Sequence, residues 1–262
     1  MMALEPHGTD VFVGVGPQYP WGGLYGGQIV AQGLRAAANT VEPEFRVHSL
    51  HAYFIRRGDH EQPIRFEVDR LRNGRSFVTR SVVARQPVGA IFEMSVSFQR
   101  DEPGHDVQIA QLSEVPGPEE SVVSDRWSSM FERRFAVARN AEEGRAAAWL
   151  RMTHPVGDDP VLQACALAYM SDDLPTDAVV ALHPDRPAPG NDDPDEWGFM
   201  SASLDHAIWF HRPLRTEDWH LHSFTSHGFL SSRGLSVGHV LTDSGVHVAT
   251  IAQEVLLRPA RR

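Results

Sequence analysis

The sequence GGQIVAQGLRAAAN, residues 26–39, and the segments that follow it decide the fold. Its apolar residues recur at helical spacing, which predicts one amphipathic helix that begins at Gly26 and ends near Asn39. Four short segments rich in Val, Phe, Ile and Tyr come next, separated by the turn sequences RGD, NGR and QPVG. They predict an antiparallel meander of four strands: VHSLHAYFIR (47–56), IRFEVDRLRN (64–73), RSFVTRSVVARQ (75–86) and AIFEMSVSFQR (90–100).

The second half of the chain repeats this order. The segment PVLQACALAYM, residues 160–170, has helical periodicity, and four further strand-like segments follow it. These are SASLDHAIWFHR (201–212), WHLHSFTSHGF (219–229), RGLSVGHVLT (233–242) and VHVATIAQEVLLR (246–258). The halves align when Ser49-Leu50-His51 is matched to Ser203-Leu204-Asp205. The sequence therefore predicts an α+β protein made of two tandem helix-plus-antiparallel-sheet repeats.

The polar stretches between these segments suggest the domain boundaries. We expect one repeat over residues 12–100, a Pro- and Glu-rich linker over 101–129, and a second repeat over 130–258. A second irregular stretch, residues 171–198, carries eight acidic residues against one arginine. Its composition is typical of a solvated loop.

The composition excludes several classes of protein. A chain of 262 residues with 42% hydrophobic and 22% charged residues is globular, and no apolar run approaches the ~18 residues of a membrane span. A net charge of −10 disfavours nucleic acid as the main partner. All 24 basic residues are arginine, so a lysine Schiff base and a Walker-type phosphate loop are excluded.

The single cysteine and the two chain ends give further expectations. Cys165 has no partner for an intramolecular disulfide, and it lies in an apolar helical run where it is a buried hydrophobe rather than a nucleophile. The opening residues lack a secretory signal, and the final ARR is not a peroxisomal address. We expect a cytoplasmic protein.

Several motifs together resemble acyl-CoA thioesterase II over nearly the whole chain. They are GGLYGGQIVAQGLRAA, VHSLHAYFIRRGD, LRNGRSFVTRSVVARQ, FEMSVSFQ, ASLDHAIWFHRP, DWHLHS, SSRG and VATIAQEVLLR, in this order. The resemblance implies a double hotdog fold, in which each repeat wraps an antiparallel sheet around a central helix. It also implies hydrolysis of fatty acyl-CoA to free acid and coenzyme A, and a role in lipid metabolism, without a metal or other cofactor.

Members of that family hold the attacking water with an Asp, a Thr or Ser, and a Gln. The resemblance places the acid at Asp205 and the amide at Gln253, while the hydroxyl position falls on His227. An imidazole there is either a base that accepts the proton of water or the mark of a degraded site. The second reading leaves a non-catalytic acyl-CoA-binding protein as the alternative.

Other groups complete the expected site. The helix start at Gly26, Gly27 and Gln28 could supply backbone N–H groups for the oxyanion, or it could be a turn that only packs. The candidates for the coenzyme A phosphates are four arginines, Arg56, Arg57, Arg75 and Arg233.

Three weaker patterns in the sequence would indicate a different kind of site. The sequence GLSVG at residues 234–238 fits a nucleophile elbow, but strands rather than a helix follow it. The 14 histidines include no HExxH motif, so no metal site is expected. Asp205 and His211 leave a hotdog hydratase as a minor alternative.

Exposed sheet edges favour a homo-oligomer.

Overall fold

The computed structural model describes residues 2–124, 127–140, 142–186 and 198–260. The predicted first helix and the four strands after it are confirmed almost residue for residue. They are α1 (Gly26–Ala38), β3 (Phe45–Phe54), β4 (Ile64–Asn73), β5 (Phe77–Gln86) and β6 (Gly89–Arg100). Two short strands precede the helix, β1 (Glu5–Pro6) and β2 (Val11–Gly14).

The second half has the same plan. The predicted helix is α2 (Pro160–Met170). The segment 201–212, predicted as one strand, is divided at Leu204 into β10 (Phe199–Ser203) and β11 (Asp205–Phe210). The other three predicted strands are β12 (His220–Leu230), β13 (Arg233–Thr242) and β14 (His247–Pro259). Three strands that the sequence analysis did not identify precede this helix: β7 (Val122–Val123), β8 (Phe131–Asn140) and β9 (Arg145–Met152). Residues 101–109, in the expected linker, are exposed.

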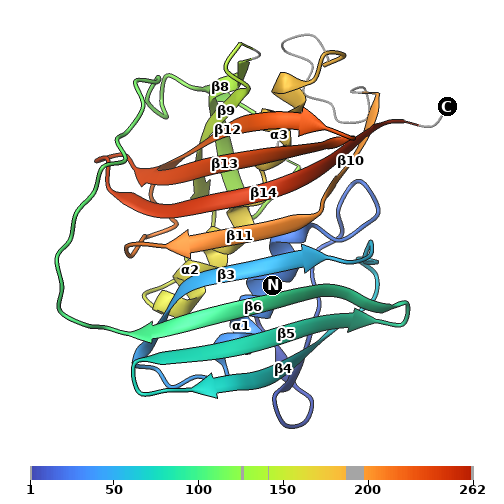
Figure 1. Ribbon diagram of the computed structural model, residues 1–262, viewed down its shortest axis with the longest axis vertical. Coiled ribbons are helices and arrows are strands. Elements are labelled where there is room, and N and C mark those ends of the chain that lie inside the picture. The colour runs from blue at the N-terminus through green and yellow to red at the C-terminus, as the bar shows by residue number, and fades with distance from the viewer. Residues whose placement is uncertain (1, 125–126, 141, 187–197, 261–262) are drawn as a thin grey trace.

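All these strands form one antiparallel sheet. Its order is β1-β2-β4-β5-β6-β3-β11-β14-β13-β12-β9-β8-β7, with β10 paired beside β11 on β14. The N-terminal order β2-β4-β5-β6-β3 is mirrored by β9-β12-β13-β14-β11, and the β3–β11 pair joins the two halves, with Leu50 opposite Ile208. The repeated strand order confirms the double hotdog fold (Figure 1).

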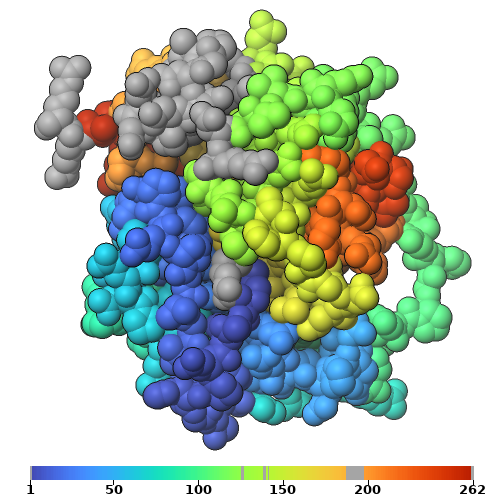
Figure 2. Space-filling model, turned by 180° about the vertical axis from the view of Figure 1, so that it is seen from behind, coloured from blue at the N-terminus to red at the C-terminus, as the bar shows by residue number. Residues whose placement is uncertain are grey.

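The two central helices lie against one face of this sheet and pack on each other (Figure 1). The helix α1 buries ten of its thirteen residues, because it is covered both by the sheet and by α2. Figure 2 shows the opposite side of the molecule, where the N-terminal segment in blue meets the green to orange segments of the second half. No helix in the described ranges is long and apolar enough to cross a membrane.

The prediction of a solvated loop over residues 171–198 is wrong for the first part of that stretch. Residues 175–182 form the helix α3 (Pro175–Leu182), which packs on β12. Three of the eight acidic residues, Asp172, Asp173 and Asp177, are less than a tenth exposed. Apolar residues such as Leu174 and Val179 hold this segment in the core, so its charges are buried with it. Residues 187–197 of the stretch lie outside the described residues.

Two buried histidines of β12 make stability depend on pH. Burial lowers the pKa of His220 to about 4 and that of His222 well below its usual value, and neither ring nitrogen of His222 has a hydrogen-bond partner among the described residues. A histidine that is neutral when folded takes up its proton only on unfolding. Its contribution to stability is therefore complete above pH ~6.5 and is lost as the pH falls toward the folded pKa.

We expect His222→Leu to remove part of this acid sensitivity. Between pH 6.5 and pH 5, the free energy of unfolding of the variant should fall by about 2 kcal/mol less than that of the wild type. Urea unfolding at both pH values measures the difference. The exposed His227→Leu should leave the pH dependence unchanged, and an equal flattening in both variants would contradict the assignment to His222.

Candidate active site

The N-terminus of α1 and the C-terminus of α2 meet at Asp172. This residue lies two positions after the last residue of α2, and its Oδ2 accepts a hydrogen bond of 3.0 Å from the backbone N–H of Gly27. The first N–H groups of a helix have no partner within the helix, and its N-terminus carries a partial positive charge. The start of α1 therefore stabilises the anionic form of the Asp172 carboxyl group.

Two glycines allow this close approach. A Cβ atom on Gly26 would lie 2.6 Å from Asp172 Oδ2, and one on Gly27 would lie 2.2 Å from the backbone oxygen of Tyr169. A side chain at Gly26 would displace the Asp172 carboxylate, and one at Gly27 would force the two helix ends apart, because the atom that it meets is a backbone oxygen. The glycines of the first motif are thus explained by the contact between α1 and α2.

A serine and a glutamine continue the hydrogen-bond chain from Asp172. The Oγ of Ser203, the last residue of β10, donates to Asp172 Oδ1 at 2.9 Å. The Nε2 of Gln253, on β14, donates to Ser203 Oγ at 2.8 Å. Asp172 and Gln253 are buried, and Ser203 is partly exposed. An acid, a hydroxyl and an amide from three separate segments of the second half therefore form one connected trio.

The acid of this trio titrates close to neutrality. Burial raises the pKa of Asp172 to about 6, and the hydrogen bonds from Ser203, Gln253 and Gly27 oppose that rise. The neighbouring Asp173 raises it further. A carboxyl group with such a pKa is an effective general base at neutral pH, because it is ionised and still basic enough to accept a proton.

His206 fixes the orientation of the Gln253 amide. Its Nδ1 contacts Gln253 Oε1, and its Nε2 lies 2.8 Å from Ser171 Oγ. Burial lowers the pKa of His206 to about 4, so the ring is neutral at pH 7. In the tautomer with the proton on Nδ1, the ring donates to Gln253 Oε1, which leaves Gln253 Nε2 directed at Ser203.

The structure separates the three residues that the sequence analysis grouped. Gln253 shares the buried face of β14 with Ile251 and Val255, whereas Asp205 lies on the other face of the sheet from its buried neighbours His206 and Ile208. The Asp205 Oδ1 accepts a hydrogen bond of 2.6 Å from the backbone N–H of Glu254. Asp205 and Gln253 therefore do not converge on one water molecule.

The third residue of that group, His227, is exposed on β12. The register of the β12–β13 pair shifts between Ser226 and Gly228, so His227 is the extra residue of a bulge. Its neighbour Ser226 is buried and donates from Oγ to the backbone oxygen of Leu235 at 3.2 Å. We find no contact that links His227 to Asp172, Ser203 or Gln253 among the described residues.

Most of the residues expected to bind the oxyanion or the coenzyme A phosphates have hydrogen-bond or ion-pair partners within the protein. The Gly27 N–H points at Asp172, as described, while the buried Gln28 side chain donates to Gln32 Oε1 at 3.3 Å. Arg57 Nη2 donates to the backbone oxygen of Trp21 at 2.5 Å, and Arg56 donates to that of Ala90 at 2.6 Å. Arg233 pairs with Glu254 at 2.9 Å, and Arg75 lies in the turn between β4 and β5.

An aromatic cluster adjoins the trio on the side of α1. It surrounds Gly27, since a Cβ atom there would lie 2.6 Å from the ring of Tyr25. The rings of Tyr25 and Trp127 are 4.7 Å apart, and those of Tyr25 and Tyr169 are 5.1 Å apart. The other members are Tyr19, Trp21 and Phe131. Its polar groups are the indole N–H groups, of which that of Trp127 donates to Asp173 Oδ1 at 3.0 Å, and the phenols of Tyr19, Tyr25 and Tyr169, whose pKa values are raised by burial.

Comparison with known proteins identifies the family. The profile of the acyl-CoA thioesterase N-terminal domain matches residues 16–99, and that of the acyl-CoA thioesterase C-terminal domain matches residues 107–257. The chain belongs to the acyl-CoA thioesterase family. It is 32% identical to human acyl-coenzyme A thioesterase 8 over 98% of this chain and 88% of the relative. It is also 32% identical to acyl-CoA thioesterase 2 of Haemophilus influenzae, over 98% of this chain and 96% of the relative.

Solved structures support the same family and fold. The acyl-CoA thioesterase II TesB2 from Mycobacterium marinum superposes with a TM-score of 0.84 at 33% identity, over 99% of this chain and 96% of that one. A hot dog fold protein of unknown function from Alicyclobacillus acidocaldarius has a TM-score of 0.80 at 18% identity, covering 99% and 97% of the two chains, which supports the fold alone.

The sequence analysis missed Asp172 and Ser203. Asp172 could have been noticed because it follows the helix 160–170 almost directly. The acidic composition of residues 171–198 instead led to the prediction of a solvated loop. The signal for Ser203 was its position in a strand beside that of Gln253, together with the family's use of an acid, a hydroxyl and an amide. Within the described ranges, no three His, Cys, Asp or Glu residues are placed to hold a metal ion.

Proposed function

We propose that this member of the acyl-CoA thioesterase family hydrolyses fatty acyl-CoA to free fatty acid and coenzyme A, with Asp172, Ser203 and Gln253 as its catalytic residues. The observation that carries the proposal is the connected trio at the start of α1, with bonds of 2.9 and 2.8 Å. Asp172 and Ser203 take the places that the sequence analysis gave to Asp205 and His227, and Gln253 keeps its role.

In this mechanism a water molecule attacks the thioester carbonyl directly. The water oxygen bonds to the carbonyl carbon while Asp172 accepts a proton from it. The Ser203 hydroxyl and the Gln253 amide hold the water in line with the carbonyl. When the tetrahedral intermediate collapses, the carbon–sulfur bond breaks and the proton passes from Asp172 to the leaving thiolate. Atoms and charge balance without a further reactant.

Neighbouring groups supply binding and charge stabilisation. The positive end of α1 at Gly26 and Gly27 lies beside the reacting carbonyl and lowers the cost of the developing oxyanion. The aromatic cluster around Tyr25 and Trp127 provides an apolar surface for the acyl chain. Of the four candidate arginines, Arg57 lies against the segment that leads into this helix, since a Cβ atom on Gly23 would lie 2.7 Å from its Nε. We propose Arg57 as a ligand of the coenzyme A phosphates.

A panel of acyl-CoA substrates tests the proposed function. Purified protein should release a thiol from at least one chain length well above the rate in buffer. Tight binding of acyl-CoA with intact ligand recovered afterwards would instead show a non-catalytic binding protein. Addition of water to an enoyl-CoA without thiol release would show a hydratase. Either of these outcomes, without thioester cleavage, overturns the proposal.

The titration of Asp172 predicts the acid limb of the pH profile. Because only the ionised carboxylate accepts a proton from water, kcat/KM should fall tenfold per pH unit below a pKa of about 6. The neutral His206 should add no second titration above pH 5, since its pKa is lowered to about 4. Initial rates from pH 4.5 to 8 with the best substrate measure this limb. A profile that stays flat down to pH 5 would exclude Asp172 as the base.

We also propose that the chain acts in the cytoplasm as a homo-oligomer. The sheet edges are short, since β1 and β7 have two residues each, which does not favour edge pairing. The sheet face that no helix covers carries large exposed side chains, including Tyr53 and Leu235 at 65% and 44% exposure. These side chains suit association through that face. Light scattering after gel filtration measures the mass, and a monomer at micromolar concentration would contradict the expectation.

A further inference from the structure

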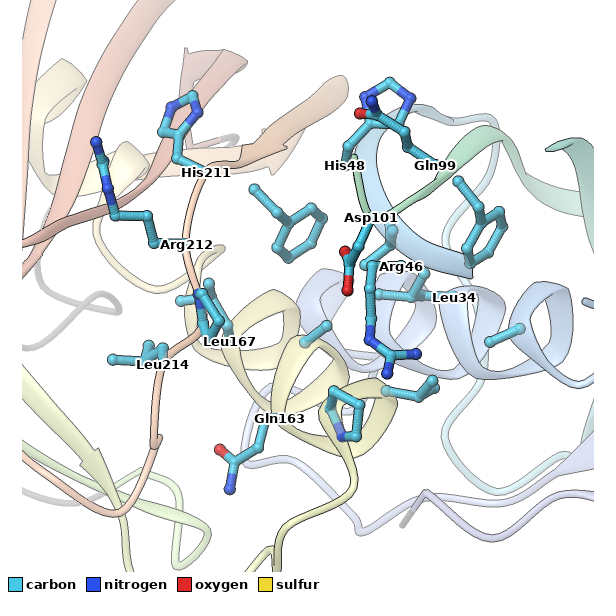
Figure 3. A pocket seen from close by; sticks show the side chains of 18 of the residues that line it. Leu34, Arg46, His48, Gln99, Asp101, Gln163, Leu167, His211, Arg212 and Leu214 are labelled. Carbon is cyan, nitrogen blue, oxygen red and sulfur yellow. The ribbon is translucent and has the colours of Figure 1, made fainter. Parts of the chain in front are cut away.

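A cavity of about 590 Å³ lies at the other end of the two central helices, away from the trio. Leu34 and Ala38, near the end of α1, line it on one side, and Pro160 and Ala164, at the start of α2, line it on another. Figure 3 shows Leu34 on α1 beside the labelled α2 residues Gln163 and Leu167. The start of β3, the end of β6 and the segment after β11 close it. Its volume falls within the range of about 300–1,000 Å³ that is usual for small-molecule sites.

The repeat relates this cavity to the trio. The trio lies between the end of α2, the start of α1, the segment before β11 and the last third of β14. Exchanging the two halves of the fold converts these elements into the end of α1, the start of α2, the start of β3 and the end of β6. These are the elements that line the cavity, where Phe98 is the last buried residue of β6 and Gln99 lies on the other face.

The counterpart site lacks the acid of the trio. Asp172 follows the end of α2 by two residues, whereas the residues after Ala38, the end of α1, are Asn39, Thr40 and Val41. The Thr40 hydroxyl is itself bound, because it accepts from Arg80 Nε at 2.7 Å and donates to the backbone oxygen of Ala37 at 2.8 Å. No residue directly after the end of α1 therefore corresponds to Asp172.

The lining combines an apolar floor with a charged rim. The floor is made by side chains from both halves: Leu34, Val47, Phe98, Leu167, Phe210 and Leu214. At the rim, Arg100 pairs with Glu44 at 2.8 Å, Arg215 pairs with Asp158 at 3.3 Å, and Arg212 pairs with Asp106. Two further exposed acids, Asp101 and Glu102, also lie at the rim.

Arg46 is the rim cation that remains available. Its guanidinium donates to the backbone oxygen of Pro43, and among the described residues no carboxylate lies within ion-pair distance of it. Figure 3 shows its side chain lying along the start of α2, at the edge of the apolar floor. A ligand with an anionic head and an apolar tail is complementary to this arrangement, because the head can pair with Arg46 while the tail covers the floor.

We propose that this cavity is a second, non-catalytic ligand site that binds a free fatty acid, with its carboxylate at Arg46 and its chain between α1 and α2. The proposal rests on the repeat and on this cavity, and it stands whether or not the trio hydrolyses thioesters.

Photolabelling locates the ligand directly. A twelve-carbon fatty acid with a diazirine in its chain is irradiated with the full-length protein, and the labelled peptides are identified after cleavage at arginine. The cavity residue Ala38 lies in the fragment 36–46, whereas Gln253 lies in a fragment that begins at Gly234. We expect saturable labelling of 36–46 that unlabelled laurate competes away. Labelling confined to the fragment with Gln253, or spread without saturation, would overturn the proposal.

Two variants test the contacts. Ala164→Trp fills the cavity and should abolish labelling of 36–46, while the rate of thiol release stays within about threefold of wild type. Arg46→Gln should weaken binding of laurate about fivefold or more and leave binding of dodecanol unchanged. Arg65→Gln removes an exposed arginine of β4 outside the cavity and is the matched control. Equal effects of the two arginine variants, or equal losses for laurate and dodecanol, would overturn the role of Arg46.

Discussion

Replacing Asp172 by asparagine should lower kcat by about 10²–10⁴-fold, because the amide cannot accept the proton of the attacking water. Asparagine has the shape of aspartate, and its single side-chain oxygen can still accept from the Gly27 N–H, while its NH2 group takes the place of the oxygen that accepts from Ser203. Substrate binding should therefore change little, so the loss should appear in kcat rather than in KM. Steady-state kinetics with the best acyl-CoA of the panel measure both constants.

Two controls distinguish this effect from unfolding and from a catalytic role of Asp205 or His227. The carboxyl pKa is raised by folding to about 6, so at pH 8 the ionised group makes the folded state less stable, and removing it should not lower the free energy of unfolding. Asp205→Asn and His227→Ala should retain kcat within about threefold, since both residues lie away from the trio. A loss in Asp205→Asn equal to that in Asp172→Asn would restore Asp205 to the mechanism.

The sequence predicted the fold well because each repeat has its own strong pattern. The period of the residues that form α1 and α2, and the β-branched and aromatic strands after them, are local properties that need no knowledge of the rest of the chain. The strand β9, which contains AAAWL, was missed because alanine-rich segments carry little strand signal. Its pairing with β8 and β12 and the helix α3 that packs on it make that segment a strand.

The sequence did not show which of the candidate site residues lie together, for a physical reason. Gln253 was identified through the resemblance, and its place as an amide among the apolar residues of its strand agreed with that choice. Asp172 is an acid in a stretch rich in acids, and only the tertiary contact with Gly27 distinguishes it. For His227, a single-residue bulge altered the correspondence between sequence position and sheet face. Asp205 was placed correctly in a strand, but its pairing with the backbone of Glu254 could not be read from spacing.

Gly27→Ala should lower kcat/KM by about 100-fold or more and the free energy of unfolding by about 1–3 kcal/mol. The added Cβ would lie 2.2 Å from the backbone oxygen of Tyr169, and a backbone atom cannot turn aside as a flexible side chain does. The helix ends must separate, which lengthens the hydrogen bond from the Gly27 N–H to Asp172 and moves the base away from the attacking water. Urea unfolding identifies a temperature at which the variant is folded. Kinetics at that temperature distinguish the loss of activity from the loss of stability.

Gly104→Ala is the matched control for this change, because no atom lies within 4 Å of its added Cβ. It should alter neither activity nor stability measurably. The outcome that contradicts the role of the α1–α2 contact is a folded Gly27→Ala that keeps more than about a tenth of kcat/KM, since a catalytic base displaced by an ångström costs about 10²-fold. The acid limb of the variant adds an independent readout. The hydrogen bond from the Gly27 N–H lowers the pKa of Asp172, so losing this bond should raise that pKa and move the limb to higher pH.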